Sequence, residues 1–217
     1  MVDYSSRRTM MVDTQIRPSD VTKFPIIDAM LDVPREAFVP DHLLEAAYVD
    51  ENLAISDDRI LLEPRTFAKM LDALDIQPTE AVLDLGCGLG YSTAILARLS
   101  EAVVAVEEDH DLAEDAQARL SGMGVDNAAV VAGALAEGAA TNGPYDVIVV
   151  QGGVEAVPEA LTDQLRDGGR IACVFMEGAL GVCRTGSRNG DSVTWRFAFN
   201  ASAPVLDGFF RTEEFAL

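Results

Sequence analysis

The residues with the clearest chemical potential are a glycine-rich segment and an acidic residue about twenty positions beyond it. Asp84 precedes three glycines in the spacing G-x-G-x-G, namely Gly86, Gly88 and Gly90. Glycines let a ligand approach the backbone closely, and the free amides of a helix start can contact polar ligand atoms. Glu107 carries a carboxylate that can accept hydrogen bonds from both hydroxyls of a ribose. Together these residues predict a site for an adenosyl ligand.

The glycine spacing indicates which adenosyl ligand to expect. The dinucleotide fingerprint is G-x-G-x-x-G, so a pyrophosphate cofactor, and with it a dinucleotide-dependent oxidoreductase, is the second choice. In a purely structural alternative the glycines only make a tight turn and Glu107 is a surface acid. A strand before the loop and a helix after it favour ligand binding. We therefore expect S-adenosylmethionine as the cofactor.

The other reactive side chains predict no second site. The chain has an odd number of cysteines, and no two of them form a C-x-x-C pair: Cys87, Cys173 and Cys183. We therefore expect buried, reduced thiols that form neither disulfides nor a zinc site. His42 and His110 have no ligand-spaced partners. No metal site is expected.

The glycine loop belongs to a pattern of alternating strands and helices. Strands are predicted at 81–85, 102–106, 127–132, 145–150 and 170–175, and helices at 91–99, 109–120 and 158–165. This alternation is typical of a parallel sheet covered by helices on both faces. Two further strands, 182–185 and 193–199, flank a turn and predict an antiparallel hairpin at the sheet edge. The expected fold is α/β, Rossmann-like, with a mainly parallel sheet and a C-terminal antiparallel hairpin.

The rest of the chain gives no sign of a domain boundary. Helical pieces at 19–31 and 64–74 lie among proline-punctuated segments, so we expect residues 1–78 to cap the sheet and shape a substrate pocket. Neither an internal repeat nor a low-complexity linker interrupts the chain. We expect one domain over 1–217, with a cofactor-binding core at 79–176 and a hairpin and tail at 177–217.

Charge and hydropathy limit the partners. The formal net charge of -20 repels phosphate backbones, so no nucleic-acid partner is expected. No apolar run approaches the roughly 18 residues that cross a bilayer, so we expect no membrane anchor. Arg7 and Arg8 are not followed by the apolar stretch of a signal peptide, which favours a cytoplasmic location.

Several segments resemble one protein family. They are the loop at 86–91 and the segments 29–30, 33–40, 47–50 and 164–170. Over about residues 10 to 199 the chain resembles the protein-L-isoaspartate O-methyltransferase family of class I S-adenosylmethionine-dependent methyltransferases. The loop is generic to methyltransferases, whereas the proline-arginine segment 33–40 is more particular. The resemblance implies carboxyl methylation of isoaspartyl residues in proteins or peptides, a repair reaction.

The resemblance also implies roles for individual residues. The segment from Asp84 to Tyr91, with Gly86, Cys87, Gly88 and Gly90, would border the methionine part of the cofactor. Glu107 would hold the ribose, and Ala134 and Leu135 would flank the adenine. The family usually has an aspartate at the position of Ala134, so one hydrogen bond to the adenine amine is expected to be missing.

The segment before Pro64 departs from the family pattern. Ile60 and Leu62 stand where the family usually has a threonine and a serine whose hydroxyls meet the substrate carboxylate. Methyl transfer to a carboxylate needs no strong base, because the acceptor is ionised at neutral pH and alignment dominates catalysis. We therefore assign no catalytic residue. A desolvated carboxylate without donors costs several kcal/mol, so we predict negligible turnover of isoaspartyl peptides.

Two questions stay open from the sequence. Arg59 or Arg65 is a candidate to pair with an acidic substrate, because a guanidinium holds a carboxylate through two parallel bonds. Both are equally compatible with a surface position beside neighbouring acids. A second functional hypothesis is a cofactor-binding protein that has lost catalysis and acts through partner contacts.

Overall fold

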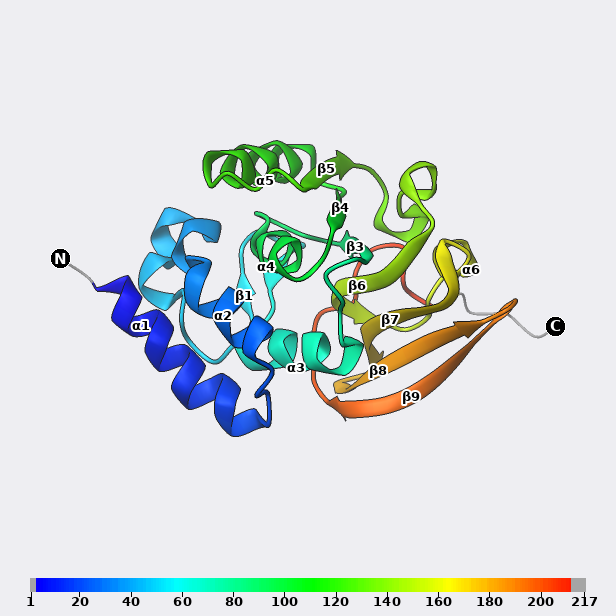
Figure 1. Cartoon of the computed structure of the whole chain (residues 1–217), viewed down its shortest axis with the longest axis horizontal. Coiled ribbons are helices and arrows are strands. Elements are labelled where there is room, and N and C mark those ends of the chain that lie inside the picture. Colours follow the sequence, from blue (N-terminus) through cyan, green and yellow to red (C-terminus); the bar gives the residue numbers. More distant parts are fainter. Residues whose placement is uncertain (1–2, 212–217) are drawn as a thin grey trace.

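A seven-stranded sheet forms the centre of the computed structural model, which describes residues 3–211 (Figure 1). The strands are β3 (Ala81–Leu85), β4 (Ala102–Glu107), β5 (Ala128–Ala132), β6 (Tyr145–Val154), β7 (Leu165–Glu177), β8 (Leu180–Asn189) and β9 (Ser192–Asn200). Their order across the sheet is β5-β4-β3-β6-β7-β8-β9. Strands β3 to β7 are mutually parallel, and β8 and β9 are antiparallel. The predicted fold class, including the terminal hairpin, is confirmed.

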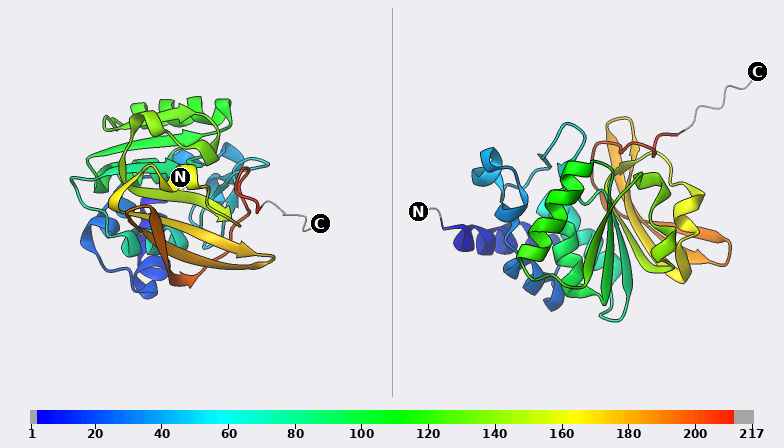
Figure 2. Two further views of the ribbon diagram at one scale, coloured as in Figure 1. Left: turned by 90° about the vertical axis from the view of Figure 1, so that its right-hand side faces the viewer. Right: turned by 90° about the horizontal axis from the view of Figure 1, so that it is seen from above.

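The two faces of the sheet are covered by different kinds of element. On one face lie α3 (Pro64–Leu74), α4 (Tyr91–Leu99) and α5 (His110–Gly122), which pack on alternate side chains of the strands. On the other face lie short helical turns at Leu135–Glu137 and Glu159–Thr162 (α6) and the segment 205–209. The right-hand view of Figure 2 shows the sheet between these two layers.

The predicted helix at 158–165 is wrong in its length, since α6 spans one turn, Glu159–Thr162. The chain enters β7 already at Leu165, which pairs with Tyr145. The Gln164 side chain caps the end of the helical segment, since its Nε2 donates to the carbonyls of Ala160 and Glu137. Strand pairing thus prevails over the helical preference of the local sequence at Leu165.

The N-terminal region forms a helical layer against the first face. α1 (Tyr4–Met11) continues through short turns to Ser19, and α2 spans Phe24–Asp32. The predicted helix at 19–31 therefore begins five residues too early, because Asp20 adopts a left-handed conformation (φ 66°) that ends the preceding turn. A two-stranded hairpin, β1 (Leu53–Ala54) and β2 (Ile60–Leu61), was not predicted.

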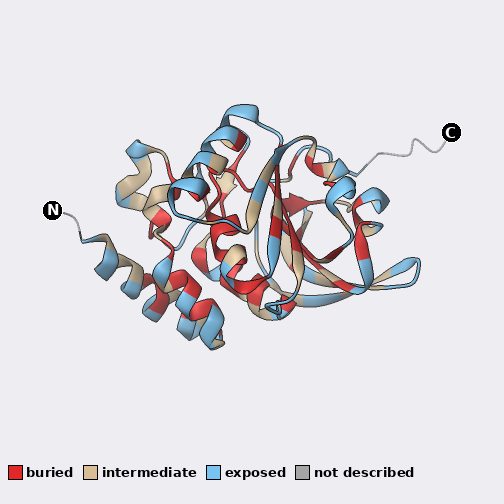
Figure 3. Ribbon diagram, turned by 45° about the horizontal axis from the view of Figure 1, so that its top comes forward, coloured by how far each residue is buried: buried red, intermediate tan, exposed pale blue. Residues whose placement is uncertain are grey.

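The cap and one face of the sheet share one hydrophobic core. A single cluster of buried side chains runs from Met11 through Phe38 and Phe67 to Val147 and Ala203. Figure 3 shows buried residues along the strands and on the inward sides of the helices. Within residues 3–211, the helices are all too short or too polar to cross a membrane.

Candidate functional site

The glycine loop lies between the end of β3 and the start of α4, as predicted. Gly86, Gly88 and Gly90 have φ values of 77°, 55° and 96°. These left-handed values are strained for residues with a side chain, so the loop needs glycine at each position. The loop turns the chain directly from a central strand into a helix start at the carboxyl edge of the sheet.

Glu107 ends β4, the neighbouring strand, and its side chain points to the loop. Its Oε2 accepts a hydrogen bond from the Gly88 amide at 2.8 Å. Its Oε1 accepts from the amides of Glu108 at 2.8 Å and Asp109 at 3.1 Å. The side chain is 0% exposed. The structure therefore brings the loop and Glu107 together.

Arg59, in the turn between β1 and β2, lies on the same carboxylate. Its Nε donates to Glu107 Oε1 at 2.8 Å, and its Nη1 donates to the Asp58 carbonyl at 2.8 Å. The Arg59 side chain is 4% exposed. Arg65, by contrast, is 48% exposed and pairs with Glu63 at 3.1 Å. The arginine that faces the site is Arg59.

Asp84 is buried at the end of β3 and is fully hydrogen-bonded. Its Oδ2 accepts from Ser92 Oγ at 2.6 Å and Thr93 Oγ1 at 2.7 Å, and its Oδ1 accepts from Gln151 Nε2 at 2.7 Å. Burial raises the pKa of Asp84 to about 6, although these three donors oppose the shift. The carboxylate ties the loop to the first turn of α4 and to β6.

Replacement of Asp84 by asparagine is expected to change how stability depends on pH. An acid whose pKa rises from 3.8 to about 6 on folding binds more protons in the folded state, so its contribution to stability falls as pH rises through this window. The unfolding free energy of the wild type should therefore fall by up to about 3 kcal/mol relative to Asp84→Asn between about pH 4 and about pH 7. Urea denaturation of both proteins across this range measures the difference. A constant difference would contradict the raised pKa.

Apolar side chains cover the outer side of the glycine loop. A Cβ placed on Gly86 would lie 3.5 Å from Leu135 and 3.6 Å from Leu206. A Cβ placed on Gly88 would lie 2.5 Å from Ile55 Cδ1. Ala134 and Leu135 directly follow the end of β5, where Gly133 donates its amide to the Glu107 carbonyl at 3.0 Å. The loop, Glu107 and the segment 134–135 thus meet at one edge.

Cys87 and Tyr91, both assigned to this site from the resemblance, direct their side chains into the core. The Cys87 side chain packs with Ala105 and Ala116 beneath α5, and burial raises the pKa of its thiol. Tyr91 is 1% exposed and forms an edge-to-face pair with Phe38. These two residues can therefore contact a ligand only through their backbone atoms. All three cysteines are buried and free, as predicted.

Two hollows flank Arg59. One, of about 220 Å³, lies between Arg59, Glu108, Asp109 and Asp207, and we call it the Glu108 hollow. The other, also about 220 Å³, lies between Arg59, Ile60 and the segment 204–207, and we call it the Ile60 hollow. Leu62 lines neither, because its side chain is 3% exposed and belongs to the hydrophobic core. Ile60 and Leu62 are the two apolar residues that stand where the family usually has hydroxyl side chains. Of these two, only Ile60 borders a hollow beside Arg59.

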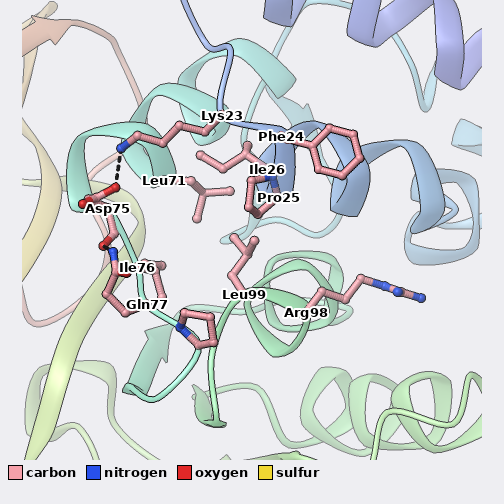
Figure 4. A pocket seen from close by; sticks show the side chains of 11 residues that line it. Lys23, Phe24, Pro25, Ile26, Leu71, Asp75, Ile76, Gln77, Arg98 and Leu99 are labelled. Carbon is pink, nitrogen blue, oxygen red and sulfur yellow. Dashed lines mark hydrogen bonds and ion pairs between the residues drawn. The ribbon is translucent and has the colours of Figure 1, made fainter.

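A third hollow, of about 380 Å³, lies between α2, α3 and α4 near the amino ends of β3 and β4 (Figure 4). Its lining is mainly apolar. The Lys23 ammonium that borders it pairs with Asp75 at 2.6 Å, and the Arg98 guanidinium points away from it to pair with Asp32. It is remote from the glycine loop and shares no residue with the site.

Arg35 has a structural role that the sequence did not reveal. Its Nε donates to the Ala47 carbonyl at 2.8 Å and its Nη2 to the Leu62 carbonyl at 2.7 Å. Its guanidinium carbon lies 4.9 Å from the centre of the Tyr91 ring. The side chain is 0% exposed. Arg35 therefore joins the cap to the chain after β2 and to α4, and its place in the segment 33–40 was the only signal.

The residues present fit an adenosyl cofactor at this edge. Glu107 offers a carboxylate at the end of β4, and the three glycines leave the backbone of the loop without side chains. Each carboxylate oxygen has two lone pairs. Oε2 of Glu107 receives one donor and can accept one further hydroxyl, whereas Oε1 already receives three. Among residues 3–211, no group of acidic, histidine or cysteine side chains is arranged to hold a metal ion.

Comparison with known proteins identifies the family. The family model described as Protein-L-isoaspartate(D-aspartate) O-methyltransferase (PCMT) matches residues 6–191. The chain belongs to the protein-L-isoaspartate O-methyltransferase family. It is therefore an S-adenosylmethionine-dependent O-methyltransferase by family, and the resemblance seen in the sequence is confirmed. This membership rules out the alternative that the chain is a dinucleotide-dependent oxidoreductase.

Individual members of the family match over most of their length. The chain is 39% identical to the protein-L-isoaspartate O-methyltransferase of Syntrophus aciditrophicus over 168 residues, 77% of each chain. It is 32% identical to that of Roseiflexus castenholzii over 214 residues, 98% of each chain. A solved protein-L-isoaspartate O-methyltransferase has a TM-score of 0.83 at 25% identity, over 93% of this chain and 66% of that one.

A second solved structure shows the same fold at lower identity. It is that of a protein from Plasmodium falciparum, described as a possible member of this family and solved with S-adenosyl-L-homocysteine. Its TM-score is 0.78 at 19% identity, over 95% of this chain and 99% of that one. The seven-stranded sheet and its cap are thus the architecture of the family.

Proposed function

We propose that this chain transfers the methyl group of S-adenosylmethionine to a carboxylate of a protein or peptide. The observation that carries the proposal is the Glu107 carboxylate, held 2.8 Å from the Gly88 amide at the carboxyl ends of β3 and β4. In open α/β sheets, ligands bind at this edge. The backbone from 86 to 91 would border the methionine part, Glu107 would hold the ribose, and Ala134 and Leu135 would lie beside the adenine.

Methyl transfer to a carboxylate depends on alignment of the acceptor with the methyl group more than on acid or base catalysis. S-adenosylmethionine, when bound, supplies a methyl group on a positively charged sulfur. The acceptor carboxylate is already ionised at neutral pH, so no residue needs to remove a proton. The chain's contribution is to hold the acceptor in line and to exclude water, for which Ile55, Leu135 and Leu206 are placed over the loop.

The family relatives suggest an isoaspartyl acceptor, and the Ile60 hollow suggests that this chain uses it slowly. Ile60 borders the hollow and offers no hydrogen-bond donor. A carboxylate placed there loses its hydration without a replacement from this side chain. We propose low turnover of isoaspartyl peptides by the wild type. Rapid turnover would contradict this proposal.

Replacement of Ile60 by threonine tests the missing donor. The new hydroxyl can donate to the acceptor carboxylate, and kcat/KM for an isoaspartyl peptide is expected to rise about tenfold. Ile60→Val is the matched control, because valine has the shape of threonine without the hydroxyl. Transfer of labelled methyl groups measures both. An equal gain in Ile60→Val would show that space, and not a donor, limits the reaction.

We also propose that the whole chain works as one domain. The hydrophobic cluster that links Met11 in the cap to Ala203 after β9 supports this. A cytoplasmic location stays a prediction from the sequence. The alternative of a cofactor-binding protein without catalysis predicts binding of S-adenosylmethionine with no methyl transfer to any peptide carboxylate. Calorimetry with the cofactor followed by methylation of a peptide mixture separates the two.

A further inference from the structure

Arg59 is the one cation among the residues that line the two hollows. The other charged side chains around it are acidic, namely Asp57, Asp58, Glu108, Asp109 and Asp207. An acceptor carboxylate that enters the Ile60 hollow therefore finds a single positive group to pair with. In the structure this group is already engaged, because Arg59 Nε lies 2.8 Å from Glu107 Oε1. The same arginine borders the expected places of the cofactor and of the acceptor.

The donors that already surround Glu107 limit what else can bind to its carboxylate. Oε1 accepts from Arg59 and from two backbone amides, and Oε2 accepts from Gly88. A ribose presents two neighbouring hydroxyls, and a carboxylate that holds both uses an acceptor site on each oxygen. The Glu107 side chain is 0% exposed, and of its four donors three are backbone amides and one is the Arg59 side chain. A ribose can therefore reach this carboxylate only if Arg59 leaves.

We infer that Arg59 and the cofactor ribose compete for Glu107, and that the displaced Arg59 becomes the group that binds the acceptor carboxylate in the Ile60 hollow. This inference rests on the proposed function. A guanidinium matches a carboxylate with two parallel N–H donors, which replaces part of the donors that Ile60 and Leu62 lack. Cofactor binding would thus prepare the acceptor site, and the two ligands would bind in order.

The first test measures binding of S-adenosylhomocysteine and S-adenosylmethionine by calorimetry. Arg59→Gln removes the competitor, so both ligands are expected to bind about tenfold more tightly than to the wild type. Arg65→Gln removes an exposed arginine six positions away and should leave both affinities unchanged. Glu107 keeps its three backbone donors in Arg59→Gln, so the loop retains its anchor. Unchanged or weaker binding to Arg59→Gln would overturn the inference.

The second test measures the coupling between ligands without turnover. A saturating amount of S-adenosylhomocysteine is expected to tighten binding of an isoaspartyl peptide to the wild type about tenfold, because it releases Arg59. The same peptide with that carboxylate amidated should show no such effect. Arg59→Gln should lose the coupling, and Arg59→Lys should keep part of it, because an ammonium retains the charge without the fork. Equal coupling in Arg59→Gln would overturn the inference.

The two tests separate failure of this inference from failure of the proposed function. If neither the wild type nor Arg59→Gln binds S-adenosylhomocysteine, the proposed cofactor site is wrong and the inference falls with it. If both bind it equally well, the proposed function stands and the competition at Glu107 is wrong.

Discussion

Replacement of Glu107 by alanine is expected to weaken binding of S-adenosylmethionine at least about a hundredfold. The ribose loses a charged acceptor, and hydrogen bonds to charged groups contribute about 1.5–3 kcal/mol each. The Gly88 amide also loses its partner, so the loop is held to the end of β4 only by the Gly86 amide on the Val106 carbonyl. Calorimetry with S-adenosylmethionine and S-adenosylhomocysteine measures the loss.

The neighbouring acid provides the control for this substitution. Glu108 is 43% exposed and lies 3.7 Å from Arg59 Nη2, so Glu108→Ala removes a negative charge beside the site without touching the loop. It should change cofactor affinity by less than about threefold, as expected for a screened surface charge. Equal losses in the two variants would mean that only the local charge matters and that Glu107 does not hold the ribose.

Replacement of Arg35 by alanine is expected to lower the unfolding free energy by about 4 kcal/mol. Two carbonyls in the core, those of Ala47 and Leu62, lose their donors, at about 1–3 kcal/mol each. The truncation also leaves a cavity next to Tyr91, and large-to-small changes in a core typically cost 3–5 kcal/mol. Relief of the desolvated guanidinium, whose pKa burial lowers, offsets part of this loss.

Urea denaturation at neutral pH measures the Arg35 effect. Arg98→Ala is the control, because Arg98 is 52% exposed and its ion pair with Asp32 lies on the surface. That variant should lose no more than about 1 kcal/mol. If Arg35→Ala is as stable as the control, the hydrogen bonds to Ala47 and Leu62 do not hold the cap on the sheet. Arg35→Ala should also lower the rate of methyl transfer. The lost hydrogen bond holds Leu62, and Arg59 and Ile60, which border the proposed acceptor site, lie just before Leu62 in the chain.

The local signals in the sequence were sufficient for the centre of the fold. The apolar run at 81–85 followed by three glycines predicted β3, the loop and α4 with their bounds. Glu107 was placed correctly because neighbouring parallel strands end at the same edge. By contrast, α1 was missed, because its first turns read Ser5-Ser6-Arg7-Arg8 and carry no apolar periodicity.

The direction of single side chains could not be predicted. Arg59 lies beside Asp57 and Asp58, so its sequence neighbourhood is that of a solvated surface turn. Its partner, Glu107, is 48 positions away, and only the folded chain brings the two together. The same holds for Leu62, whose position before Pro64 suggested the acceptor site. Packing of the cap against the sheet turns it into the core instead.

The cover of the glycine loop has a consequence for biosynthesis. Gly86 and Glu107 leave the ribosome early, but Leu206, which lies against Gly86, is made about a hundred residues later. The segment that carries it is held to β6 by a bridge between Gly153 and Val205. A nascent chain that stops before this segment contains all seven strands but lacks Leu206, so Gly86 keeps only Leu135 on this side. Messages truncated in this region should therefore yield protein whose cofactor loop is less well shielded from water than in the full chain.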